Sequence, residues 1–143
     1  QKIYEILMIP FVGSFATITL DGRPWVRYIM GIADYDLVIR FATCKDSRKV
    51  AQIAANSQVH LTTGSTSLTE MGPYMQIEGT AEFTRDEKER HDFWSDGLSS
   101  YFEGPDAPNY GIVLIRPTRI ELNEPPNMSP NIWTADEDKT DED

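Results

Sequence analysis

Two basic residues and a hydroxyl residue stand where a β-type run gives way to a helical pattern. The run Leu37–Ala42 ends just before Thr43, and Ser47, Arg48 and Lys49 then occupy the expected first helical turn. Backbone N–H groups at a helix start lack an intrahelical partner, and the helix dipole makes that end positive. Two cations and a hydroxyl at such a place predict an anion site suited to a phosphate group.

A third cation, Arg27, lies on the expected preceding strand and can approach the same place from the side. It shares its strand face with Trp25 and Ile29, which suits a trough that is part charged and part apolar. The sequence also allows two alternatives to an anion site. Basic residues at an exposed helix start are often simply solvated, and Arg27 can instead pair with Glu78 or Glu82 on a neighbouring strand.

The chain has 143 residues, 40% of them hydrophobic, and a formal net charge of −10. This length suits one domain with a genuine core, which we place at residues 1–134. The acidic stretch 135–143 predicts a solvated, disordered tail. Such an acidic chain argues against binding to nucleic acid, and no apolar run reaches 18 residues, so we expect no membrane span. The single cysteine, Cys44, fits a reducing compartment, and we expect a cytoplasmic protein.

The pattern of strands and helices predicts an α+β domain built on a small antiparallel barrel. The expected strands are 13–20, 23–33, 37–43, 59–63, 74–84 and 110–122, with helices at 3–9, 47–55 and 86–94. Asp21-Gly22 signals a hairpin turn, and Gly79 and Pro117 each signal a bulge or bend. The apolar run Ile112–Ile115 predicts a strand that is buried on both faces. Residues 64–72 are polar and read as a loop.

At this point the order of motifs resembles the pyridoxamine 5′-phosphate oxidase-like family, the FMN-binding split barrels, and especially its general-stress-protein members. The ordered set covers roughly residues 3–122, and its matching pieces are Phe15–Pro24 with Arg27, Phe41–Thr43 with Ser47–Lys49, Ile53–Asn56, Ile77–Glu82 and Arg116–Glu121. The resemblance implies a six-stranded antiparallel split β-barrel with Greek-key character and peripheral helices. It also implies a homodimer with FMN sites along the subunit interface.

The resemblance also implies roles for individual residues. In proteins that look like this one, Arg27, Ser47, Arg48 and Lys49 would hold the FMN phosphate. The backbone of Tyr28, Ile29 and Met30 would run along the isoalloxazine ring, Thr43 would hydrogen-bond the flavin, and Tyr74 would reach it from the partner subunit. Trp133, an aromatic residue near a polar terminus, predicts that this end docks, over the flavin or on the partner, or else packs loosely.

Two departures separate the chain from true pyridoxamine-phosphate oxidases. Those enzymes hold their substrate with a C-terminal Arg-x-His segment, whereas residues 123–143 contain neither arginine nor histidine, and their strand-end lysine falls on Ile32. We therefore expect a flavin-dependent oxidoreductase that acts on a small organic substrate or electron donor other than pyridoxine phosphate. The alternatives are a non-catalytic FMN module, a reductase that uses the deazaflavin F420, and an empty interaction barrel. No residue is identified as a general acid or base.

Other reactive residues carry weaker signals. Cys44 lies inside the expected cofactor turn, where a redox thiol and a small filler residue are both conceivable. His60 and His91 are isolated from each other and from other ligands in the sequence, so neither predicts a metal site or a catalytic triad.

Overall fold

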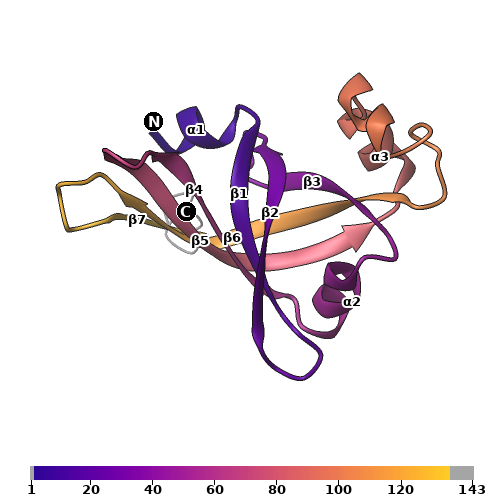
Figure 1. Ribbon diagram of the computed structural model, residues 1–143, viewed down its shortest axis with the longest axis horizontal. Coiled ribbons are helices and arrows are strands. Elements are labelled where there is room, and N and C mark those ends of the chain that lie inside the picture. Colours follow the sequence, from indigo (N-terminus) through magenta and orange to yellow (C-terminus); the bar gives the residue numbers. More distant parts are fainter. Residues whose placement is uncertain (1, 136–143) are drawn as a thin grey trace, which may run out of the picture.

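The protein is an antiparallel β-barrel of six strands with a seventh strand added to its side (Figure 1). The structure is a computed structural model that describes residues 2–135, with the side chains of residues 65 and 66 excluded. The strands follow the order β3-β2-β1-β4-β5-β6-β7, and an additional pairing of β3 with β6 closes the ring. The expected α+β split barrel is therefore confirmed. The expected tail lies, apart from Ala135, outside the described residues.

The elements follow the sequence prediction closely in number and order. They are α1 (Lys2–Leu7), β1 (Phe11–Ile18), β2 (Pro24–Ala33), β3 (Ile39–Cys44), α2 (Arg48–Ala55), β4 (Gln58–Thr66), β5 (Met71–Thr84), α3 (Glu87–Phe93), the 3₁₀ helix η1 (Asp96–Ser100), β6 (Tyr110–Asn123) and β7 (Asn131–Thr134). Within the described residues, no helix is long and apolar enough to cross a bilayer.

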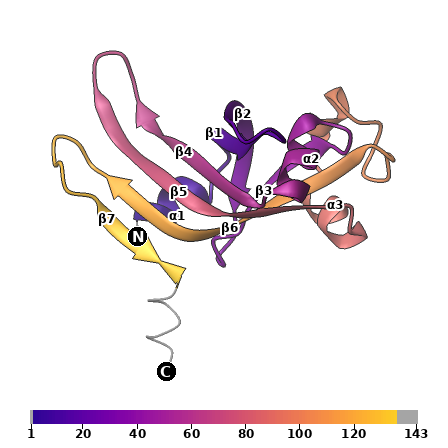
Figure 2. The same cartoon turned by 90° about the horizontal axis from the view of Figure 1, so that it is seen from below.

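Strand β6 is buried on both faces, as its continuous apolar run predicts. Val113 and Ile115 face the barrel interior, where they join the main core. The alternate residues, among them Tyr110 and Ile112, face outward and form a second core with apolar residues of the α3–η1 region. This second core fixes α3 and η1 against the outside of the barrel. Figure 2 shows them at one end of the long β5–β6 ribbon, with β7 at the other.

Two local predictions about turns and bulges are confirmed. The hairpin between β1 and β2 contains Gly22 at φ +87°, a conformation that an L side chain rarely adopts. The β5–β6 ladder shifts register between Glu78 and Gly79, opposite Pro117. A Cβ at Gly79 would lie 2.5 Å from the backbone oxygen of Arg116, so the close approach of the two strands requires glycine there.

Two segments differ from the sequence prediction. The predicted loop at 64–72 is wrong, because β4 continues to Thr66, β5 begins at Met71, and only a short turn closes the hairpin. The β4 side of this hairpin is rich in threonine and the β5 side begins Met71-Gly72-Pro73, so no apolar alternation marks it in the sequence. The C-terminal segment forms the unexpected strand β7, in which Trp133 pairs with Ile120 of β6.

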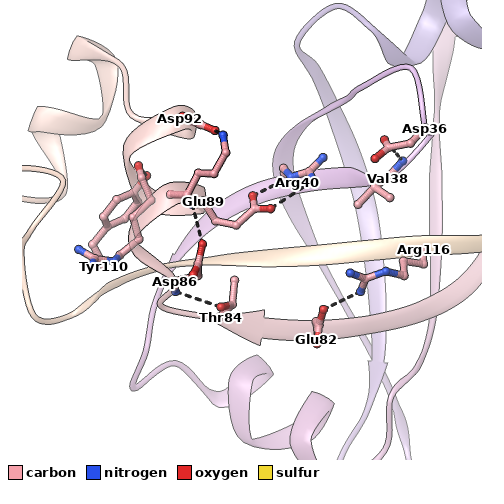
Figure 3. Close-up of polar contacts among 12 residues, drawn as sticks. Asp36, Val38, Arg40, Glu82, Thr84, Asp86, Glu89, Asp92, Tyr110 and Arg116 are labelled. Carbon is pink, nitrogen blue, oxygen red and sulfur yellow. Dashed lines mark hydrogen bonds and ion pairs between the residues drawn. The ribbon is translucent and has the colours of Figure 1, made fainter.

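A partly buried ion pair holds α3 to the barrel (Figure 3). Arg40 of β3 donates from Nε and Nη2 to the two carboxylate oxygens of Glu89 at 2.8 and 3.3 Å. Their side chains are 22% and 26% exposed. Asp86 caps the same helix by accepting a hydrogen bond from the backbone N–H of Glu89 at 3.1 Å. The pair and the cap together fix the direction in which α3 leaves β5.

We predict that Arg40→Met destabilises the protein by about 2 kcal/mol, because Glu89 would keep a half-buried charge without its partner. Amide exchange should accelerate in α3 and η1 more than in the barrel. The matched control is Arg116→Met. Arg116 pairs with Glu82 at 2.6 Å, but the two side chains are 53% and 56% exposed, so this loss should stay below about 1 kcal/mol. Equal losses from urea unfolding of the two variants would contradict the assignment.

Candidate functional site

A groove opens where the barrel splits between β2 and β3. These strands pair only through Ile32 with Arg40 and Ala33 with Ile39, whereas β3 pairs with β6 along its whole length, from Ile39 to Cys44. The edge of β2 from Arg27 to Met30 therefore has no strand beside it on this side within the described chain. The groove between the separated strands has a volume of about 440 Å³. It offers backbone hydrogen-bonding groups along one side, as an open strand edge does.

The opposite side of the groove is an apolar wall, defined here as Phe93, Leu98, Tyr101 and Phe102 of the α3–η1 region. The wall is backed by Tyr110, whose ring centroid lies 4.9 Å from that of Phe102. The Tyr110 hydroxyl donates to the carbonyl of Arg90 at 2.8 Å. Burial raises the pKa of Tyr110 to about 12, so the hydroxyl keeps its proton at neutral pH. The apolar wall therefore packs on Tyr110, whose position is fixed by its hydrogen bond to Arg90.

The charged end of the groove lies at the start of α2. Lys49 donates from Nζ to Thr43 Oγ1 at 2.8 Å and to Ser47 Oγ at 3.4 Å. Ser47 is the N-cap residue of α2, but its hydroxyl makes no capping hydrogen bond to the helix backbone. The structure therefore brings together Thr43, Ser47 and Lys49, as the sequence predicted. The first N–H groups of α2 are left without a side-chain cap beside a cation, which suits an anion.

Arg27 reaches this end of the groove from β2, held by neutral oxygens. Its Nη1 donates to the carbonyl of Phe15 at 3.1 Å and to Thr17 Oγ1 at 2.9 Å, and its Nη2 donates to Gln52 Oε1 at 3.2 Å. The alternative that Arg27 pairs with Glu78 or Glu82 is wrong, since neither carboxylate contacts it in the described structure.

Arg48 completes the cation cluster, which we define as Arg27, Arg48 and Lys49. The Arg48 guanidinium carbon lies 5.6 Å from the ring centroid of Trp25, a cation–π distance. Among residues 2–135, none of the three cations forms an ion pair with a carboxylate. Arg40 and Arg116, by contrast, each pair with a glutamate.

Burial and mutual repulsion lower the pKa values of two members of the cluster, Lys49 and Arg27. Burial lowers the pKa of Lys49 below its ordinary 10.5, and the charge of Arg27 lowers it further, against a smaller opposing effect of Cys44. Burial also lowers the pKa of Arg27, with a further contribution from Arg48. Both effects disfavour the charged forms, and a bound anion would relieve them. Binding of an anionic ligand to the cluster is therefore electrostatically favourable.

The structure places the ten predicted site residues in four places. Six line the groove: Arg27, Tyr28, Ile29, Met30, Thr43 and Lys49. Ser47 and Arg48 lie at its charged end, in contact with Lys49 and Trp25 respectively. Tyr74 lines a neighbouring groove that also contains Tyr28. Trp133 is partly buried against the main core of its own chain, so this terminus docks on the barrel.

Sequence reasoning missed two kinds of residue. Thr17 and Gln52 are buried polar residues that contact Arg27, and nothing in the local sequence pattern marks either of them as buried. The apolar wall was also missed, because its residues come from a region without regular periodicity. Cys44 is a free, partly exposed thiol at the groove. His60 is exposed on β4, and His91 pairs with Asp106 at 2.8 Å.

We predict that the stability contributed by Lys49 depends on pH. Because its pKa is lower in the folded chain than the ordinary 10.5, the unfolded chain binds the proton more tightly in this window. Rising pH should therefore stabilise the ligand-free wild type relative to Lys49→Met as the pH passes from the lowered pKa of the folded chain towards 10.5. Urea unfolding at several pH values measures this. The variant Lys45→Met removes an exposed lysine and corrects for the loss of one charge. The prediction would be contradicted if the free energy of unfolding of the wild type, relative to Lys49→Met, fell as the pH rises.

Comparisons with known proteins agree with the fold and locate the chain in a family. A family model described as pyridoxamine 5′-phosphate oxidase matches residues 1–124. General stress protein 26 of Bacillus subtilis (strain 168) is 32% identical over 122 residues, 85% of this chain and 86% of that protein.

Solved structures give the same result. The crystal structure of general stress protein 26 from Bacillus anthracis str. Sterne has a TM-score of 0.78 and 28% identity, covering 93% of this chain and 95% of that one. A pyridoxamine 5′-phosphate oxidase-related, FMN-binding protein of Nostoc punctiforme PCC 73102 shares the fold, with a TM-score of 0.60, 17% identity and coverage of 85% and 78%. This chain belongs to the pyridoxamine 5′-phosphate oxidase family.

Proposed function

We propose that this protein binds FMN in the groove between β2 and β3 and uses it in a redox reaction with a small organic molecule. One observation carries the proposal: the cation cluster forms no ion pair with a carboxylate of residues 2–135 and stands at the end of a largely apolar groove, in a chain of net charge −10. A ligand with a phosphate at one end and an apolar ring system at the other matches both parts. The FMN-binding relative from Nostoc punctiforme supports the choice of flavin.

Each part of the groove has a role in this proposal. Arg27, Arg48, Lys49 and Ser47 would hold the phosphate, and Thr43 would bond the flavin system. The open edge of β2 at Tyr28, Ile29 and Met30 would supply backbone partners for the polar atoms of the ring. When bound, the flavin would supply the hydride or electron transfer, while the protein supplies orientation, exclusion of water and charge.

The chemistry of the groove limits the second substrate. Its lining residues include basic but no acidic side chains, and the apolar wall faces the open edge of β2. These features favour a neutral or anionic organic molecule. Ile32, which takes the place of the strand-end lysine of true pyridoxamine-phosphate oxidases, lines a different groove beside α3. We therefore do not propose pyridoxine phosphate as the substrate.

We predict that the double variant Arg27→Ala/Lys49→Ala loses FMN, because two charge-assisted contacts to the phosphate disappear. Its affinity for FMN should fall by at least about a hundredfold, while its affinity for riboflavin, which has no phosphate, should change little. Titration followed by flavin fluorescence measures both affinities. Stoichiometric FMN in this variant would refute the proposed phosphate site.

A matched double variant, Arg23→Ala/Lys45→Ala, removes two exposed cations outside the groove and should keep its FMN. Mass spectrometry of whatever small molecule the denatured wild type releases distinguishes FMN from F420. Anaerobic reduction of the loaded protein with NAD(P)H, followed by a screen of electron acceptors, then separates an oxidoreductase from a non-catalytic flavin carrier.

We further propose that the protein is a homodimer whose subunits meet over the outer face of β1 and β2. Tyr28 and Met30 are 79% and 70% exposed, and Val12 and Val26 are exposed on the same face. An apolar surface of this kind, continuous along two paired strands, marks an interaction site. The face lies between the FMN groove and the groove that contains Tyr74, so a partner seated there could bring its own Tyr74 to the cofactor.

We predict that Val12→Glu/Val26→Glu produces monomers, because the partner would have to bury two carboxylates without counter-charges. Sedimentation velocity should show the change, and FMN affinity should fall with it. Tyr35→Glu, which introduces a charge at an exposed aromatic residue of the β2–β3 turn, should remain dimeric. A double variant that stays dimeric would show that the subunits meet elsewhere.

A further inference from the structure

Two buried polar residues connect Arg27 to the body of the protein. Thr17 of β1 is 1% exposed and Gln52 of α2 is 6% exposed, so both are enclosed side chains. The Thr17 hydroxyl donates to Gln52 Oε1 at 2.5 Å, and both oxygens accept from the guanidinium, at 2.9 and 3.2 Å. Buried polar groups are expensive to enclose unless they are paired, so this arrangement requires an explanation.

The chemistry of the donors fixes the orientation of this network. A guanidinium offers only N–H donors, so the Gln52 atom that faces it must be the oxygen. The Thr17 hydroxyl directs its single proton to that same oxygen and accepts from Arg27 with a lone pair. Arg27 is therefore the donor in each of these contacts, and its guanidinium group is held by one residue of β1 and one of α2.

The partners of Arg27 in this network are all neutral, which is unusual for a half-buried arginine. Buried arginines are normally paired with carboxylates, which cancel their charge. Here the partners are a carbonyl, a hydroxyl and an amide, and the charge of Arg27 lowers the pKa of Lys49. A carboxylate in the same place would hold the side chain equally well but would neutralise it.

We propose that Thr17 and Gln52 are positioning residues that orient Arg27 while leaving its full positive charge for the phosphate of the ligand. This inference rests on the proposed function, since the ligand phosphate is the group that would use the charge. It assigns the buried glutamine a role in selecting phosphorylated over unphosphorylated flavin. The proposal depends on the neutral side chain at position 52, which is glutamine and not glutamate.

The test is Gln52→Glu, which keeps the size and the accepting oxygen but adds a carboxylate next to Arg27. The affinity for FMN should fall at least about tenfold, because an ion pair replaces a charge free to bind the phosphate. The affinity for riboflavin should change by less than about threefold, and the melting temperature should not fall. The matched control is Ala51→Glu, which adds the same charge at an exposed position of α2 and should keep wild-type affinity for FMN.

A purely structural role for Gln52 predicts a different result: the melting temperature would change, and the ratio of FMN to riboflavin affinity would stay at the wild-type value. That result would overturn the inference, as would equal losses of FMN affinity in Gln52→Glu and Ala51→Glu. The comparison of these two variants decides the question even if riboflavin binds too weakly to titrate.

A second variant covers the case in which Gln52→Glu fails to fold. Thr17→Val has nearly the same shape but lacks the oxygen between Arg27 and Gln52, and it should lower the FMN-to-riboflavin affinity ratio by about threefold to tenfold. Thr17→Ser, which restores the hydroxyl, should restore the ratio, and an unchanged ratio in Thr17→Val would refute the role. Failure of the proposed function itself looks different, since the wild type would then bind no FMN at all.

Discussion

The partial burial of positive charge at Arg27 and Lys49, increased by repulsion within the cluster of Arg27, Arg48 and Lys49, is the constraint on which the candidate site depends. An acidic chain could easily have supplied carboxylates to neutralise these cations, as it does for Arg40 and Arg116. Their partners are instead hydroxyls, an amide, a carbonyl and an aromatic ring. Proteins often accept such local destabilisation where a ligand will later relieve it. The arrangement is therefore best understood as a binding site prepared for negative charge.

The split in the barrel places this charge at one end of an open groove. Because β3 leaves β2 after two residue pairs, the strand that carries Arg27 also presents an open backbone edge. On its other side β3 pairs with β6 along its whole length and closes the ring, and the outward face of β6 supports α3 and η1 through the second core. The short β2–β3 pairing leaves the strand edge open, and the second core places the apolar wall at the same groove.

Membership of the family establishes the fold and the general design, but it does not settle the reaction. One fold carries many activities, and the reaction is decided by the particular groups in the site. In this chain those groups favour a flavin phosphate and an apolar, uncharged or anionic second molecule. Ile32 is apolar and lines another groove, beside α3, and this is the reason why the proposed function does not include pyridoxine phosphate as substrate.

The sequence by itself determined strands β1 to β6, the three α-helices and the cation cluster, because apolar alternation, turn residues and basic residues at a helix start are local signals. Gly22, Gly79 and the double-faced run in β6 could all be recognised in this way. Only the tertiary structure decided which oxygens hold Arg27, since Thr17 and Gln52 meet it from elements distant in the chain. It also decided the apolar wall and the strand β7. These features depend on strand register and on packing between remote segments, which no short stretch of sequence encodes.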